Sequence, residues 1–149
     1  DESDRIRTRF LQGDGKTEKV AELRHDLQMT MEDGAGVFRT GDSLQQARDK
    51  LGELRQRSQR IAIQDTSRTF NVELIGALEL DFMLDVAETI LHSAHARHES
   101  RGAHVRLDYP ERDDQNFLTH TLAYRTPDGP RLDSLPVTIT QWQPEERKY

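Results

Sequence analysis

The sequence contains no cysteine among its 149 residues. This absence excludes disulfide bonds, a cysteine nucleophile, and zinc or iron–sulfur sites with cysteine ligands from the chain. No stretch approaches the roughly 20 apolar residues that span a bilayer, so we expect no direct membrane insertion. No secretory signal precedes the first expected helix. These absences are compatible with a cytosolic origin.

The chain also lacks a block of basic residues. Its formal net charge is −6, and Lys and Arg are interspersed with Asp and Glu, so we expect no nucleic-acid partner. Hydrophobic residues make up only 34% of the chain and charged residues 32%. In a chain of single-domain length, this balance suits a small helical domain better than a thick α/β core.

Motifs for nucleotide binding and for a serine nucleophile are missing as well. The sequence has no Gly-x-Gly-x-x-Gly, no Gly-x-x-x-x-Gly-Lys-Ser/Thr and no Gly-x-Ser-x-Gly. These patterns normally supply the phosphate-binding loop and the strained turn of a reactive serine. The sequence therefore predicts no nucleotide site of its own and gives little support to nucleophilic catalysis.

Two segments show the spacing of helices with one apolar edge. In residues 17–33 apolar side chains recur every three or four positions, which predicts a first helix. A second helix is expected to begin at a capping box formed by Ser43 and Gln46. It carries a narrow apolar seam that we expect to face a third helix. The seam residues are Leu44, Ala47, Leu51, Leu54, Ser58 and Ile61.

The third expected helix covers about residues 71–100 and is apolar around most of its circumference. A helix of this kind is buried on several sides. At ~30 residues it would be about 45 Å long, so it either forms the centre of the domain or also supports a neighbour. Gly102 is expected to terminate it. The prediction is a mainly α fold, with a three-helix up-and-down bundle in residues 1–103.

Residues 104–149 are predicted to form an irregular C-terminal extension. Asp113 or Asp114 could cap a short helical turn in its first half. Residues 119–125 and 135–142 are rich in β-branched residues and alternate in polarity. They could pair as a small β-hairpin across residues 126–134.

Four of the six histidines lie close together, at positions 92, 95, 98 and 104. On a helix the first three would drift across ~120° of the surface, so they cannot all reach one ion. Structural zinc also needs four ligands, and no cysteine is available. We therefore expect no metal site and interpret His95 and His98 as solvated residues. A pH switch would need a bistable element, which the sequence does not identify.

A run of charges balanced in sign surrounds the expected helix end. It allows two interpretations, a solvated loop with local ion pairs or a polar lock that pins the C-terminal tail and an adjoining domain or subunit. Irregular backbone needs hydrogen-bond partners, which arginine and carboxylate side chains supply. The density of arginine and aspartate residues in this run favours the polar lock over the solvated loop. The residues of the predicted lock are Glu99, Arg101, His104, Arg106, Arg112, Asp113 and Asp114.

The stretch "ARHESRGAHVRLDYPERDDQNFLTHTLAYR" resembles the C-terminal segment of the succinate dehydrogenase and fumarate reductase flavoprotein subunit. Residues 96–104 match that family's Ala-Arg-x-Glu-Ser-Arg-Gly-Ala-His core. Residues 110–121 match its Pro-x-Arg-Asp-Asp-x-Asn-aromatic-Leu-x-His-Thr pattern, and Arg147 with Tyr149 matches its closing Arg-x-Tyr. The likeness continues upstream in residues 23–44 and 67–88. L-aspartate oxidase and adenylylsulfate reductase share part of the core but fit the second pattern less well.

The resemblance implies a fragment of a larger enzyme that interconverts succinate and fumarate, passing electrons through FAD to iron–sulfur centres and quinone. FAD would be bound outside this segment, so no catalytic, cofactor-binding or metal residue is assigned here, and the fragment alone is expected to be inactive. Implied partners are the flavin domain of the same polypeptide and the iron–sulfur subunit. The complex would lie on the inner face of the bacterial membrane. The alternative is a stand-alone helical interaction module without redox activity.

Overall fold

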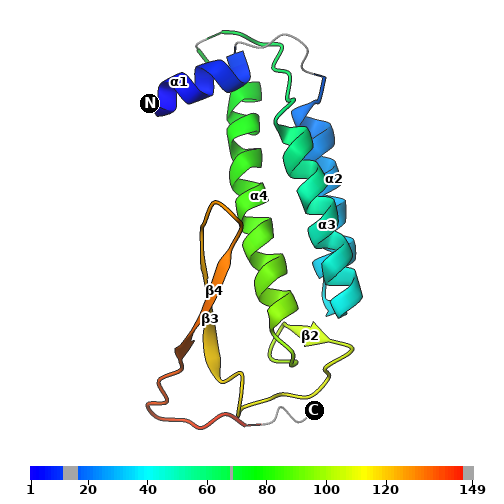
Figure 1. Cartoon of the computed structure of the whole chain (residues 1–149), viewed down its shortest axis with the longest axis vertical. Helices are drawn as coiled ribbons and strands as arrows, with labels where there is room; N and C mark the ends of the chain where they lie inside the picture. Colours follow the sequence, from blue (N-terminus) through cyan, green and yellow to red (C-terminus); the bar gives the residue numbers. More distant parts are fainter. Residues whose placement is uncertain (12–16, 68, 146–149) are drawn as a thin grey trace.

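A computed structural model describes residues 1–11, 17–67 and 69–145, so Arg147 and Tyr149 lie outside the described residues. The described part is mainly α, with a small antiparallel hairpin, which confirms the predicted fold class (Figure 1). The helical elements are α1 (Glu2–Ile6), the single π-helical turn η1 (Arg7–Leu11), α2 (Val20–Ala35), α3 (Gly41–Ser58) and α4 (Val72–Ala96). The strands are β1 (Phe38–Arg39), β2 (Val105–Arg106), β3 (Thr119–Tyr124) and β4 (Arg131–Pro136).

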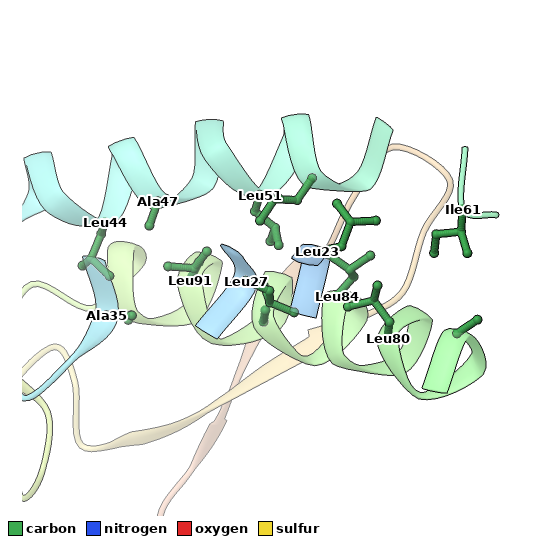
Figure 2. Packing of buried hydrophobic residues seen from close by; sticks show 14 of the residues in the cluster. Leu23, Leu27, Ala35, Leu44, Ala47, Leu51, Ile61, Leu80, Leu84 and Leu91 are labelled. Atoms are coloured by element: carbon green, nitrogen blue, oxygen red, sulfur yellow. The ribbon is translucent and has the colours of Figure 1, made fainter. Parts of the chain in front are cut away.

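Helices α2, α3 and α4 run alternately up and down and share one apolar core (Figure 1). The predicted seam of α3 is confirmed, because all six of its residues are buried. Figure 2 shows Leu44 and Leu51 directed from α3 towards α4, where Leu84 and Leu91 point back at them. Removal of these apolar side chains from water is the main term that stabilises such a bundle.

The start of α3 differs from the expected capping box. The N-cap is Thr40, whose hydroxyl accepts a hydrogen bond from the Ser43 amide at 3.0 Å. The Ser43 hydroxyl accepts in return from the Thr40 amide at 3.1 Å. The prediction of Ser43 and Gln46 was therefore wrong by three residues. Thr40 has extended backbone angles and can end the preceding strand, so the helix begins one turn earlier.

The end of α4 also differs from the prediction. The helix stops at Ala96, and Gly102 does not terminate it. Gly102 instead has φ +59° in a tight turn, in which the amides of Arg101 and His104 each donate to the other residue's carbonyl. The last carbonyls of α4 are satisfied by the distant Arg106 side chain, described below, so no glycine is needed at the helix end.

Within the described chain one side of α4 is buried and another side is exposed, so burial of this helix on several sides stays a prediction. The buried side packs on α2 and α3 and consists of Ala77, Leu80, Leu84, Ala87, Leu91 and Ala94. The exposed side carries Val72, Ile75, Phe82, Val86 and Ile90. The core of a three-helix bundle needs only one apolar side of α4, which leaves the second side unused within the described chain.

The strands of the extension contact the bundle through β2 and through the hairpin. Strand β2 pairs in parallel with β1, at Phe38↔Val105 and Arg39↔Arg106, and the hairpin packs beside α4 (Figure 1). The predicted second hairpin strand was misplaced, because β4 covers 131–136 rather than 135–142. The turn is tighter than expected, since Gly129 adopts φ +104° and its amide donates to the Thr126 carbonyl.

Helices α2 and α3 approach closely at Gly34. A Cβ atom at this position would lie 2.3 Å from the Cβ of Ala47 and 3.0 Å from the Ser43 carbonyl oxygen. Real side chains do not tolerate the first distance, so only glycine fits without a shift of the backbone of one helix. The Ser43 hydroxyl donates to the Gly34 carbonyl at 3.1 Å and fixes the same crossing.

We expect Gly34→Ala to lower the free energy of unfolding by ~1–3 kcal/mol, because the added methyl group overpacks the crossing. The measurement is urea denaturation of the purified chain. Gly52→Ala is the matched control, since Gly52 lies on α3 and a Cβ atom added there would meet nothing within 4 Å. It should stabilise the helix by ~0.5–1 kcal/mol. Equal effects of the two changes would contradict a close crossing at Gly34.

Candidate functional site

A cluster of charged residues lies at the end of the bundle where α4 stops and β2 begins. It includes every residue of the predicted lock and three residues that the sequence did not single out. We call this set the polar cluster. Its members are Arg39, Arg97, Glu99, Arg101, His104, Arg106, Asp108, Arg112, Asp113 and Asp114.

Glu99 lies at the centre of the polar cluster with a side chain that is 0% exposed. Its carboxylate accepts from Arg101 Nε and Nη2 at 2.9 and 3.0 Å, from the Asp113 amide at 2.8 Å, and from Arg97. Burial alone would raise the pKa of Glu99, but the bonds from Arg101, Asp113 and Arg97 outweigh it and leave the pKa lowered. Glu99 is therefore a buried carboxylate that is ionised at neutral pH.

A chain of ion pairs leads from Glu99 outwards. Arg101 Nη2 also donates to Asp114 at 2.6 Å, and Arg112 Nη2 donates to the other Asp114 oxygen at 2.8 Å. Arg112 Nη1 then donates to the Glu145 carbonyl at 2.6 Å. The structure thus connects the buried carboxylate to the last described residue of the C-terminal tail.

Arg106 is a buried cation, with 1% of its surface exposed. Its Nη1 donates to the carbonyls of Ala94, His95 and Arg97 at 3.1–3.2 Å, which belong to the last turn of α4 and the residue after it. A helix C-terminus presents unpaired carbonyls and a partial negative charge, so a guanidinium satisfies both its hydrogen bonds and its dipole.

Asp108 connects Arg106 to the start of α3. Its two oxygens accept from Arg106 Nε and Nη2, each at 2.8 Å, and Oδ2 also accepts from the Gly41 amide at 2.8 Å. Gly41 is the first residue of α3, where a carboxylate complements the helix dipole. Arg106 and the Gly41 amide hold the pKa of Asp108 far below its usual range. One ion pair therefore bridges the end of α4 and the start of α3.

His104 connects the polar cluster to the end of α2. Its Nδ1 lies 3.0 Å from Arg39 Nη1, and its Nε2 lies 3.2 Å from the Arg97 carbonyl. Arg39 Nε in turn donates to the carbonyls of Ala35 and Gly36 at the C-terminus of α2. Burial lowers the pKa of His104, and the neighbouring guanidinium groups lower it further. Because arginine only donates, Nδ1 accepts and the neutral ring carries its proton on Nε2.

The structure brings all seven predicted lock residues together, but it shows that three more take part. Arg97 and Asp108 lie inside the motif that carried the resemblance, so their spacing could have indicated them. Arg39 lies 65 positions from its partner His104 in the sequence, and no local sequence pattern predicts that contact.

The side chains of His95 and His98 do not belong to the polar cluster, although the His95 carbonyl accepts from Arg106. His98 lies beyond the end of α4 and its exposed ring stacks on Tyr109, with centroids 4.7 Å apart, so it is more than a solvated residue. His95 is half-buried. Among the described residues, no three His, Cys, Asp or Glu side chains lie close enough to hold a metal ion.

Chemically, the polar cluster is saturated. Each of its charged side chains has a hydrogen-bond or ion-pair partner among the described residues. Charge-assisted hydrogen bonds of this kind hold structural elements in place. The arrangement fixes the ends of α2 and α4, the start of α3 and the extension in one geometry.

Comparisons with known proteins place the chain in a larger context. Residues 24–149 match the family model described as fumarate reductase flavoprotein C-term. The fumarate reductase flavoprotein subunit of Mycobacterium tuberculosis is 50% identical over 133 residues, which cover 89% of this chain and 23% of the relative. The succinate dehydrogenase flavoprotein subunit of Rickettsia conorii is 46% identical over 122 residues, 81% of this chain and 20% of the relative.

A solved structure agrees with these sequence matches. Escherichia coli quinol fumarate reductase superposes with a TM-score of 0.90 at 46% identity, over 97% of this chain and 25% of the solved chain. The resemblance inferred from the sequence is thereby confirmed. The chain spans only about a quarter of the length of the relatives that it matches.

We expect Arg106→Ala to lower the free energy of unfolding by ~1–3 kcal/mol, because it leaves the last carbonyls of α4 without their buried donor and the Asp108 carboxylate without its partner. Thermal or urea denaturation of the purified chain measures the change. Arg131→Ala is the control, since Arg131 is exposed, pairs with Asp133 at 3.5 Å and otherwise lies over the Tyr124 ring. That change should cost less than ~1 kcal/mol. Similar losses would contradict a special role for Arg106.

Glu99 makes the stability depend on pH in a defined direction. Its pKa in the folded chain lies below the ordinary 4.5, so its contribution is complete above that value and is lost as the pH falls through the folded pKa. Glu99→Gln should therefore destabilise the chain most near pH 7, and the difference from the unchanged chain should shrink below pH ~4. Urea titrations at several pH values measure this. A difference that grows on acidification would show that Glu99 is not held ionised.

Proposed function

Because the chain belongs to the family of fumarate reductase flavoprotein C-terminal domains, we propose that it is the C-terminal domain of a flavoprotein subunit that interconverts succinate and fumarate. The observation that carries this proposal is the 50% identity across 89% of the chain. In the parent protein, FAD would exchange hydride with the dicarboxylate and pass electrons to iron–sulfur centres and quinone. FAD and substrate would be bound by the three quarters of the polypeptide outside this segment.

The share of this chain in that activity is structural. The polar cluster supports this assignment, because its charges are already paired and it joins three helix ends to the extension. A saturated cluster of this kind can present one fixed surface to a neighbouring domain. The proposed neighbours are the flavin domain of the same polypeptide and the iron–sulfur subunit, in a complex on the cytoplasmic face of the membrane. In the described part of the chain, every helix is too short or too polar to span a bilayer.

A charge reversal in the full-length flavoprotein tests this role. Arg101→Glu places a carboxylate beside the buried Glu99 and next to Asp114, so the cluster should open and the parent should lose flavin or fail to assemble. The measurements are flavin absorbance per polypeptide, co-purification of the iron–sulfur subunit and succinate oxidation with a dye acceptor. Arg131→Glu, on the exposed hairpin, is the control. Retention of flavin, assembly and turnover in Arg101→Glu would rule out the structural role.

The isolated 149-residue chain supplies the complementary test. It should be colourless, purify without flavin and show no succinate oxidation, because the proposal assigns FAD and substrate to the rest of the polypeptide. Flavin bound to the isolated chain would contradict the assignment of FAD binding to the rest of the polypeptide. A parent protein that lacks both flavin and dicarboxylate turnover would instead favour the stand-alone interaction module.

A further inference from the structure

An arginine of α3 is paired with two carboxylates of α4 halfway along the bundle. Arg55 Nη1 donates to Asp85 at 2.9 Å, and Arg55 Nη2 donates to Glu88 at 2.9 Å. These three side chains are between 27% and 34% exposed. The positive charge on α3 is therefore balanced by acidic side chains of the neighbouring helix.

The same arrangement recurs seven residues away, with histidines in place of the carboxylates. Seven positions before Arg55 on α3 is Arg48, and the residues seven positions after the two carboxylates on α4 are His92 and His95. A step of seven residues returns to within ~20° of the same side of a helix. Because α3 and α4 run in opposite directions, the two steps lead to the same level of the bundle (Figure 1). Arg48 therefore faces two imidazoles where Arg55 faces two carboxylates.

Arg48 lacks the negative partner that Arg55 has. Its Nη1 donates to the Gln45 side chain at 3.0 Å, and its Nε is buried without an acceptor. Among residues 1–11, 17–67 and 69–145, no carboxylate pairs with Arg48 and no acceptor meets its Nη2. A half-buried guanidinium with unused donors is stabilised by any anion that reaches it.

His92 and His95 are half-buried, and in the described part of the chain their rings have no hydrogen-bond partner. Burial lowers the pKa of both imidazoles, and the charge of Arg48 lowers it further. Both rings are therefore neutral at pH 7 in the absence of an added negative charge. A negative charge beside Arg48 would act in the opposite direction and favour protonated rings.

The other charged groups around the two imidazoles do not supply this negative charge. The first imidazole is near Glu88 and the second is near Asp108, but each carboxylate is paired with an arginine of its own. Arg106, and His98 when it is protonated, lower the pKa of the second imidazole. The group of Arg48 and the two histidines is therefore short of one negative charge.

We propose that Arg48, His92 and His95 bind a small, freely diffusing oxyanion, a phosphate or a carboxylate, between α3 and α4. The guanidinium donates to the anion through Nη2, and each imidazole donates to it once protonated. Binding of the anion and binding of protons therefore strengthen each other. The inference uses only residues of this chain and does not depend on the proposed function.

Modification of histidine by diethyl pyrocarbonate tests the proposal in the full-length flavoprotein subunit, because the reagent attacks the neutral imidazole. The rates at His92 and His95 are measured by peptide mass spectrometry against pH. The solutions contain inorganic phosphate, acetate or chloride at equal ionic strength in a zwitterionic buffer. His25, exposed on α2, is the internal control. Arg48→Gln removes the guanidinium, and Arg131→Gln on the exposed hairpin is the matched control variant.

The expected result is that phosphate or acetate raises the pKa of both imidazoles, with a ~10-fold gain in proton affinity over chloride, and slows their modification at neutral pH. The anion that acts identifies the chemistry of the ligand. Arg48→Gln should abolish the effect, while Arg131→Gln should retain it and His25 should not respond.

Rates that are the same in all three salts would overturn the proposal, as would an effect that survives in Arg48→Gln or that His25 shares. Protection that needs the assembled complex and no added anion would assign the position to an acidic side chain of a partner and would also overturn it. Succinate oxidation is measured on the same samples. Its absence beside anion-dependent protection would reject only the proposed function, and turnover without such protection would reject only the anion site.

Discussion

One ion pair, between the buried Arg106 and the exposed Asp108, holds the two parts of this chain together. The guanidinium occupies the negative end of α4, and the carboxylate occupies the positive end of α3. A buried arginine is unfavourable unless its donors are used, and here the carbonyls and the carboxylate accept from Nε, Nη1 and Nη2 alike. The ion pair thus satisfies the carbonyls at the end of α4 and the amide at the start of α3, and it holds the two helix ends in a fixed joint.

The extension depends on this joint because it has little core of its own. Its strands are short, most of its side chains are at least partly exposed, and its only fully buried side chain among the described residues is that of Arg106. Polar contacts to the bundle, through β1 and the polar cluster, therefore take the place of apolar packing. Their geometry is directional, which gives the extension one orientation on the bundle where apolar contacts alone would allow several.

Helix α4 has the opposite composition, with more apolar surface than the bundle needs. One side completes the core, while Val72, Ile75, Phe82, Val86 and Ile90 on another side stay exposed in the described chain. This excess agrees with a segment that covers about a quarter of its relatives' length. A domain that is stabilised at one end by saturated polar contacts, and that presents an apolar side along its longest helix, suits a supporting role within a larger flavoprotein.

The sequence by itself determined the local pattern: the three long helices, the seam of α3, the residues of the lock and, through its motifs, the family. The helices and the seam follow from the spacing of apolar residues every three or four positions. The lock and the family follow from short motifs of charged residues. Only the tertiary structure decided where α4 ends, which residues pair in the hairpin, and that Arg39 joins the polar cluster. The reason is that a helix end can be satisfied by a side chain from anywhere in the chain. The local signal at Gly102 was therefore overruled by Arg106, which reaches α4 only once the chain has folded.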